Sequence, residues 1–255
     1  MSGISSVSTY TGYSPYSTIT NGGRITQASQ DAAGLAIQEK TNSQVRGLDQ
    51  GKDNLSDGKS LLNIQDGALG QIGEYLQDIR EKSLQAMNGT LSDSDRQSIQ
   101  DQIKQYMDGI NDIAGNTTFN EKKLLDGSAG DLRIASDNNG SEEKVSTYDS
   151  TIKALGLDGY DVTGDFDISK VDEALKKVTG SRTSTGAQTN AVDYAMTYNS
   201  HAAMELNGYQ MDKEESMTTE ALQKLKTQQA LDQYQTQIQK KQMEDEQQKA
   251  MSVFA

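Results

Sequence analysis

Leucines at strict seven-residue spacing are the feature that most constrains this chain. Five leucines follow this spacing between residues 48 and 76, and a second row, Ile72, Ile79 and Ala86, lies three or four positions from the first. Heptads sustained over several repeats are typical of a coiled-coil seam. The pattern predicts one long helix from about Asp31 to about Met87. Seven glycines lie inside it; each costs about 1 kcal/mol relative to Ala. The helix therefore needs neighbours, and its small residues would let another backbone come close.

Further helices are predicted along the chain. Ser92 or Ser94 can cap one that ends at residues 115–116, because a serine side chain accepts hydrogen bonds from the first N–H groups of a helix. The next helix runs from residues 168–169 to about 211, an acidic break follows at 212–216, and a Gln-rich helix covers about 219–250. Residues 124–166 lose the helical period, which predicts loops and a small hairpin near 132–134. The residues that we expect in the helix seams are Leu48, Leu55, Leu62, Leu69, Leu76, Ile99, Ile103, Ile110, Val192 and Leu206.

Composition narrows the class of protein. The 255 residues are 33% hydrophobic and 5% aromatic, with one Pro, no Cys and a net charge of −13. An acidic balance argues against nucleic acid and against anionic membrane surfaces, because both reward clustered Lys and Arg. No run approaches the roughly 18 apolar residues of a membrane span, so we expect no membrane insertion. The first ten residues show no ordinary secretory signal, so secretion would need a dedicated route.

The sequence offers little for catalysis. The single histidine, His201, has no nucleophile and acid patterned around it as a catalytic triad requires. Asp161, Thr163, Asp165 and Asp167 have the alternating oxygens of a calcium loop, but Phe166 stands where the turn glycine belongs, so a solvated acidic loop is the better interpretation. No glycine-rich phosphate loop is present. We expect no enzyme activity, no metal and no cofactor.

Short motifs then follow one another in order along residues 22–190. They include RITQASQDAAGLAI (24–37), RGL (46–48), NLSDG (54–58), QAMNGT (85–90), SDSDR (92–96), TFNEKKLL (118–125), DEALKKV (172–178) and GAQTN (186–190). Each is weak alone, but their order and spacing together resemble the conserved helices of bacterial flagellins.

The resemblance implies a mainly α fold, a long-helix coiled-coil bundle with a small β-hairpin or loop insertion. It implies a filament subunit for motility that leaves the cell through the flagellar export apparatus and lies outside it in the flagellum. The partners implied are other flagellin subunits, an export chaperone and a capping protein. The implied domains are an inner-tube segment and connector at 1–30, a helical outer-tube core at 31–211 that includes a loop and hairpin at 127–167, and a connector and inner-tube helix at 212–255. The large outer domains of many flagellins have no room here, so the resemblance is to a minimal type.

The ends depart from the family pattern. The family has a long helix before the motif at Arg24, whereas this chain has a short segment with Tyr10, Gly12 and Pro15, and residues 251–255 stand where the family has a leucine-rich tip. An alternative therefore stays open, in which the chain is a minor axial or hook–filament junction protein that does not polymerise alone.

One family segment concerns recognition by the innate immune receptor Toll-like receptor 5. Flagellins that it detects carry Leu-Gln-Arg-x-Arg-Glu-Leu, where this chain has Asp78 in place of the first Arg, keeps Arg80 and Glu81, and ends on Lys82. Gln102 stands where the receptor-competent pattern has Glu. The resemblance therefore implies weak signalling, because reversed charge at a buried contact is costly.

Overall fold

The structure is a computed structural model that describes residues 15–253, and the side chains of residues 15–249. The chain forms two compact units. One spans Arg46–Ala202 and is called the core unit here, and the other, the terminal unit, contains the described residues before 46 and after 202. The predicted features at residues 10–14, at 254–255 and in the side chains of 251–253 lie outside the described part. Each unit is considered by itself.

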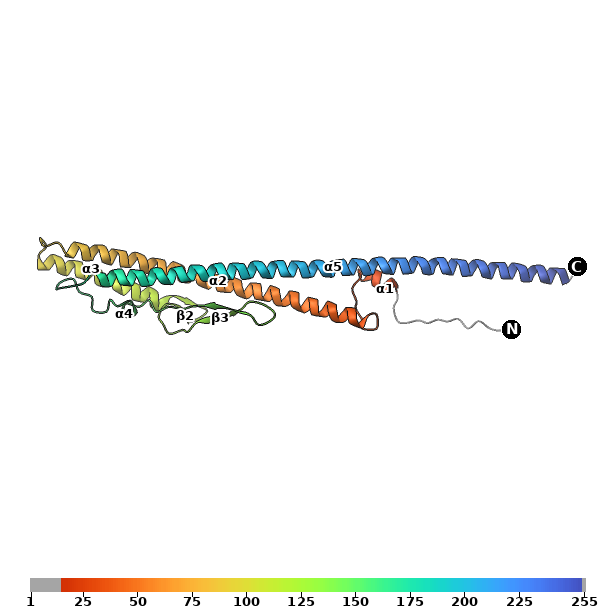
Figure 1. Cartoon of the computed structure of the whole chain (residues 1–255), viewed down its shortest axis with the longest axis horizontal. Helices are drawn as coiled ribbons and strands as arrows, with labels where there is room; N and C mark the ends of the chain where they lie inside the picture. Colours follow the sequence, from red (N-terminus) through yellow and green to blue (C-terminus); the bar gives the residue numbers. More distant parts are fainter. Residues whose placement is uncertain (1–14, 254–255) are drawn as a thin grey trace. The chain divides into compact units, whose positions relative to one another are not determined.

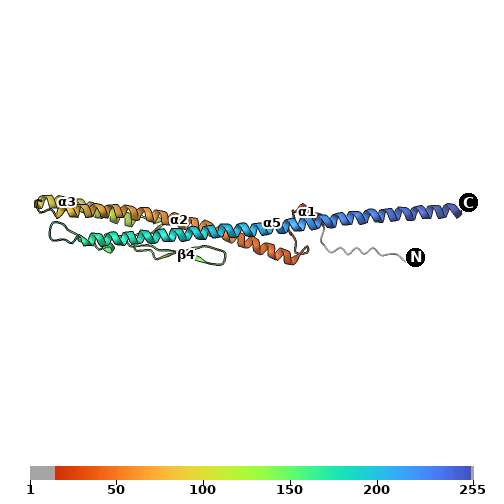
Figure 2. The same ribbon diagram turned by 45° about the horizontal axis from the view of Figure 1, so that its top comes forward.

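Three helices build the core unit: the later part of α2 (Ala32–Ala86), all of α3 (Asp93–Asn116) and the first part of α5 (Ser169–Val253). They lie side by side in both views (Figure 1 and Figure 2). Their facing side chains form one buried cluster that includes Leu55, Leu69, Ile103 and Val178. The heptad spacing therefore does mark a helix seam, and the mainly α fold is confirmed.

The start of α3 shows why sequence located it well. Ser92 accepts the backbone N–H of Asp95 at 3.2 Å, and the Asp95 carboxylate accepts the Ser92 N–H at 3.1 Å. This reciprocal pair is a capping box, which satisfies two N–H groups that have no partner inside the helix. The hydrogen bonds from Ser92 lower the pKa of the Asp95 carboxyl.

Two small antiparallel hairpins follow α3. Strand β1 (Thr118–Phe119) pairs with β2 (Lys122–Lys123), and β3 (Leu132–Ala135) pairs with β4 (Glu142–Val145) with Leu132 opposite Val145. The second hairpin confirms the prediction near 132–134. The first hairpin was not predicted, and neither was the one-turn helix α4 (Ile152–Leu155). Asn120 and Glu121 both have positive φ, 46° and 66°, which is the geometry of a tight two-residue turn.

Three glycines of α2 let the second hairpin lie directly on the helix. A Cβ built on Gly51 would overlap the Ser136 carbonyl, and one on Gly58 would overlap the end of the Ile134 side chain. Gly47 faces Asn138 in the same way. We call Gly47, Gly51 and Gly58 the glycine row. They lower the intrinsic stability of the helix but allow the hairpin to pack closely against it. At Gly47 and Gly51 another backbone does come close, as the sequence suggested, whereas Gly67 has nothing within 4 Å.

The predicted acidic break at residues 212–216 is wrong. These residues continue α5 without interruption from Ser169 to Val253. Asp, Lys, Glu and Ser carry only moderate penalties in a helix, and no Gly or Pro follows Gly208. The side-chain amide of Gln210 also donates to Glu214 one turn later, at 3.1 Å. The cluster of charge marks a solvated helix face and does not end the helix.

The terminal unit begins with α1 (Pro15–Thr20), a single short helix where no helical period was seen. Proline suits the first turn of a helix because its missing N–H has no partner there in any case. The connector after it runs against α5, where Arg24 pairs with Glu214 at 3.2 Å. Gly23 has φ of 84°, and a Cβ built on it would overlap the Glu214 backbone, so no side chain fits there.

Candidate functional site

The structure places most of the predicted seam residues in the interior. Leu48, on α2, is buried but is not a member of the core-unit cluster, and Leu206, in the terminal unit, is half-buried. The others are buried members of the single core-unit cluster: Leu55, Leu62, Leu69, Leu76, Ile99, Ile103, Ile110 and Val192. The helices thus meet through the heptad positions, and the surfaces left for other molecules are the faces opposite them.

Buried polar side chains fasten the irregular segment 146–162 to the bundle. Gln100, only 2% exposed, donates to the Tyr160 carbonyl at 3.0 Å and accepts the Val162 N–H at 2.9 Å. Gln65, from α2, donates to the Ser146 carbonyl at 3.0 Å. Such pairs matter because an unpaired buried backbone group is costly. Sequence reasoning missed them, since nothing separates these glutamines from the many exposed ones.

Tyr160 adds a further link between this segment and α2. Its hydroxyl donates to the Ser83 hydroxyl at 2.9 Å, and its ring meets Phe166 edge-on with centroids 6.1 Å apart. Burial raises the pKa of the Tyr160 hydroxyl above its usual value. The hydroxyl therefore stays protonated and serves as a structural donor.

The residues implied for receptor recognition lie on α2 and α3 of the core unit. Asp78, Arg80 and Lys82 are half-buried on α2, while Glu81 on α2 and Gln102 on α3 are exposed. Arg80 is engaged within the chain, because its Nε lies 2.7 Å from the Asp172 carboxylate of α5.

The described residues offer little for catalysis or metal binding. His201 is exposed on α5. No group of three or more His, Cys, Asp or Glu among residues 15–253 is placed to hold a metal ion. In the predicted acidic loop, the Asp161 carboxylate accepts the backbone N–H and the hydroxyl of Thr163 at 2.8 and 2.7 Å, which lowers the pKa of Asp161. The loop thus closes a turn with its own carboxylate.

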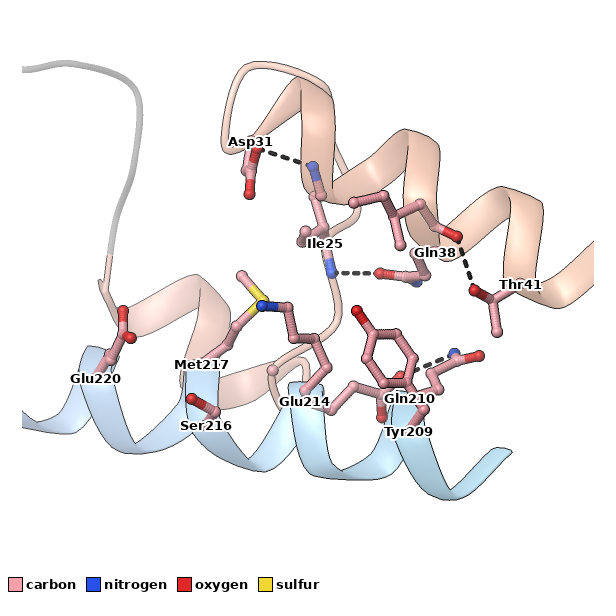
Figure 3. A pocket seen from close by; sticks show the side chains of 14 residues that line it. Ile25, Asp31, Gln38, Thr41, Tyr209, Gln210, Glu214, Ser216, Met217 and Glu220 are labelled. Atoms are coloured by element: carbon pink, nitrogen blue, oxygen red, sulfur yellow. Dashed lines mark hydrogen bonds between the residues drawn. The ribbon is translucent and has the colours of Figure 1, made fainter. Parts of the chain in front are cut away.

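A small cavity of about 190 Å³ lies in the terminal unit between the start of α2 and the middle of α5 (Figure 3). The Ile25 N–H donates to Gln38 at 3.2 Å at its edge, and the Thr41 hydroxyl donates to the Ile37 carbonyl at 2.9 Å. Met217 lies across from them on α5. The Ile25 N–H and the Thr41 hydroxyl thus find their partners within the chain.

Large apolar side chains on α5 are exposed instead. In the terminal unit Leu231, Tyr234 and Ile238 are 56%, 64% and 39% exposed, at spacings of three and four residues that put them on one helix face. In the core unit Tyr194 and Tyr198 are 78% and 67% exposed. A helix with such faces is suited to contact between proteins. None of the described helices has an apolar stretch long enough to cross a membrane.

Comparison with known proteins agrees with this geometry. Residues 15–130 match the model of the bacterial flagellin N-terminal helical region. The crystal structure of Bacillus cereus flagellin is 32% identical, with a TM-score of 0.52, and the match covers 58% of this chain and 88% of that one. The chain belongs to the bacterial flagellin family. Flagellin is a structural protein, and flagellins are components of the bacterial flagellum.

Two further proteins are similar to this chain. Phase 1 flagellin of Salmonella naestved is 38% identical over 179 residues, which are 69% of this chain and 35% of that protein. This flagellin therefore spans about a third of the length of the curated relatives it matches. A Vibrio parahaemolyticus protein assigned as flagellar hook-associated has a TM-score of 0.62 at 17% identity, over 71% of this chain and 97% of that one. At that identity the likeness shows a shared fold alone.

Proposed function

We propose that this flagellin is a structural subunit of the extracellular flagellar filament and assembles with further copies of itself for motility. The observation that carries the proposal is the likeness to Bacillus cereus flagellin across 88% of that chain at 32% identity.

Exposed apolar residues support the proposal physically. The part of α5 from residue 226 to residue 249 is exposed at every position, including Leu231, Tyr234 and Ile238. Most helix stability in proteins comes from packing, so this stretch gains stability when another subunit covers it. Assembly and ordering are then coupled. A heterologous contact that repeats without closing produces an open helical filament.

Seeded assembly followed by electron microscopy tests the proposal. We expect purified protein to elongate filament seeds, and Leu231→Glu to elongate them at least tenfold more slowly because it adds charge to the apolar face. Gln229→Glu is the matched control, since it adds the same charge at an exposed position on the opposite side of the helix. Wild-type protein that never elongates seeds would contradict the proposal. Protein that binds the seed ends and stops there would instead fit the alternative, a minor axial or hook–filament junction protein.

The division into an inner-tube part at 1–30, an outer-tube core at 31–211 and a second inner-tube part at 212–255 is part of the same proposal. So are secretion by the flagellar export apparatus and binding to an export chaperone and a capping protein. The exposed stretch 226–249 is the surface that we expect the chaperone to bind, because apolar side chains meant for assembly need to be covered before export. Titration of the purified chaperone into the full chain should give a one-to-one complex that Leu231→Glu weakens. Equal binding by that variant would contradict this assignment of the surface.

We also propose that this flagellin signals weakly through Toll-like receptor 5. The acidic Asp78 and the basic Lys82 stand where the receptor-competent pattern has Arg and Leu. In a receptor reporter assay, the double variant Asp78→Arg, Lys82→Leu should raise potency at least tenfold over wild type. Asp101→Arg, on the exposed face of α3, is the control for added positive charge. Full potency of the wild-type protein would contradict the proposal.

A further inference from the structure

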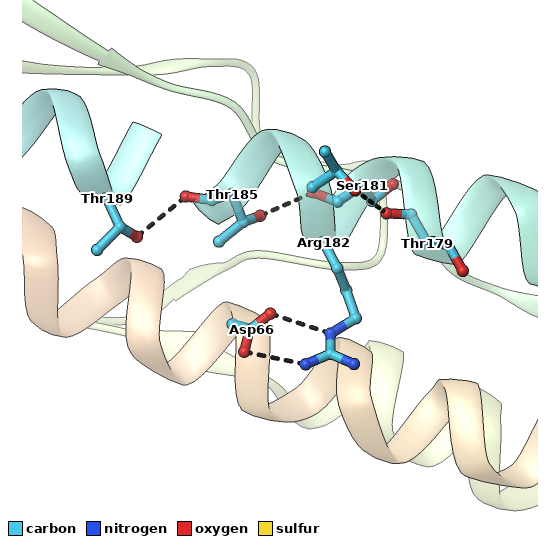
Figure 4. Close-up of polar contacts among 7 residues, drawn as sticks. Asp66, Thr179, Ser181, Arg182, Thr185 and Thr189 are labelled. Carbon is cyan, nitrogen blue, oxygen red and sulfur yellow. Dashed lines mark hydrogen bonds and ion pairs between the residues drawn. The ribbon is translucent and has the colours of Figure 1, made fainter. Parts of the chain in front are cut away.

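The outer surface of α5 in the core unit is unusual for its lack of charge. From residue 178 to residue 202 the helix has two residues of the Asp, Glu, Lys and Arg types, Arg182 and Asp193. Both are held by α2. The guanidinium of Arg182 donates to both oxygens of Asp66, at 3.0 and 3.2 Å (Figure 4), and Asp193 accepts from Lys59 at 2.7 Å. Both charged side chains of this stretch thus form ion pairs with residues of α2.

An uncharged face remains, which we name the open strip. Its members recur every three or four residues, so they line one side of a helix for about 32 Å at 1.5 Å per residue. The open strip consists of Gly180, Thr183, Ala187, Asn190, Tyr194, Tyr198 and His201, all exposed.

The two halves of the open strip differ in size. The first half, called the low half here, projects little from the helix, because Gly180 has no side chain and Ala187 carries a single methyl group. The space above Gly180 is open, since a Cβ added there would meet nothing within 4 Å. The second half bears the rings of Tyr194 and Tyr198, 78% and 67% exposed. Little on the low half demands water, since the Thr183 hydroxyl already donates to the Thr179 carbonyl at 2.9 Å. Covering such a hydroxyl leaves no donor unpaired.

We propose that the open strip is a contact surface for a second copy of this chain. In this contact Tyr194 and Tyr198 of one copy lie on the low half, Gly180 to Ala187, of the next. The inference rests on the proposed function and names a surface that serves it.

The net charge of the chain supports a second copy as the partner at the open strip. Each copy has a net charge of −13, so two copies repel when their acidic faces meet. The open strip is a surface where they touch without bringing like charges together. Tyrosine is also a residue that concentrates contact energy at interfaces. In the proposed contact the bulky half of one copy covers the low half of the next while its own low half stays free, so the contact is heterologous and allows continued growth.

Disulfide cross-linking tests the contact cleanly, because the chain contains no cysteine. The double variant Ala187→Cys, Tyr198→Cys places one thiol in each half. Under mild oxidation at assembly concentration, it should give a ladder of cross-linked oligomers, while each single variant should give no more than a trace of dimer. The control is Gln97→Cys, Asp108→Cys, which has the same spacing on the exposed, charged face of α3.

The outcomes separate the inference from the proposed function. Filaments of the double variant with no more ladder than the control would overturn the inference and leave the filament function standing. A ladder would support the contact whether or not long filaments form. Strong dimers from a single variant would also overturn it, because they indicate a two-fold contact in which like halves meet.

A second variant gives an independent reading. Tyr194→Glu puts a charge into the open strip at a position 78% exposed, so the fold should remain, which circular dichroism checks. The protein concentration needed for assembly should rise at least tenfold relative to Gln97→Glu. An unchanged concentration would overturn the inference.

Discussion

Single buried side chains decide how the irregular part of the core unit is held. Gln100 pairs with both the Tyr160 carbonyl and the Val162 N–H. In Gln100→Leu both backbone groups would be left buried without a partner, which costs about 2–4 kcal/mol in total. Urea unfolding should show this as a lower free energy of unfolding, whereas Gln97→Leu, exposed on the same helix, should change it by less than about 0.5 kcal/mol. Equal losses in the two variants would contradict the role of Gln100.

Asp137 provides a pH-dependent test at the same scale. Hydrogen bonds from the Ser141 hydroxyl and N–H lower the pKa of Asp137 below its ordinary value. Because the folded-state pKa is lower than the unfolded one, its contribution to stability is full above the unfolded pKa and is lost as the pH falls through the folded one. The difference in unfolding free energy between wild type and Asp137→Asn should therefore shrink from about pH 7 to about pH 3. A difference that stays constant would show that the turn does not depend on this ionisation.

Sequence alone indicated the residues of the helix seam but not the buried glutamines that hold segment 146–162 on the bundle. A leucine at every seventh position has one straightforward interpretation. A buried Gln such as Gln65 looks like any of the exposed Gln residues after position 222, because its burial depends on a segment about 80 residues away, at Ser146. The carbonyl that accepts from its amide nitrogen is visible only in three dimensions.

At the scale of the element, the glycines of α2 differ in whether a neighbouring segment packs against them. Gly51→Ala would push a methyl group into the Ser136 carbonyl, and overpacking of this kind typically costs about 1–3 kcal/mol. Gly67→Ala, on the same helix with nothing within 4 Å, should instead gain about 0.5–1 kcal/mol from helix propensity. Thermal unfolding of the two variants should move in opposite directions. A stabilising Gly51→Ala would mean that the hairpin is not held on the glycine row.

Helix ends were predictable where a local signal exists. Ser92 caps α3 through its own side chain, and α2 ends within a residue of the predicted Met87. The error at residues 212–216 came from taking charge as a stop signal, although only Gly or Pro breaks a helix strongly. The β1–β2 hairpin was missed because its strands have two residues each, too few for any alternation to show.

At the scale of the whole molecule, α5 should be unevenly protected. Between residues 169 and 202 it contributes Val171, Val178 and Val192 to the buried cluster, whereas residues 226–249 are exposed throughout. Amides open more easily where few side chains are buried. Hydrogen exchange of the unassembled protein should be at least 100-fold faster over 226–249 than over 169–202, and assembly should slow it. Equal protection before assembly would contradict a coupling between the two.

Gly130, in the loop between β2 and β3, has a consequence for engineering. A Cβ placed there would meet nothing within 4 Å, and the residue is exposed, whereas the turn of the next hairpin touches Gly47 through Asn138. A foreign peptide spliced in at Gly130 would hang from the core unit without lifting the hairpin off α2. Repeated along a polymer, that position would turn a filament of this small flagellin into a regularly spaced display scaffold.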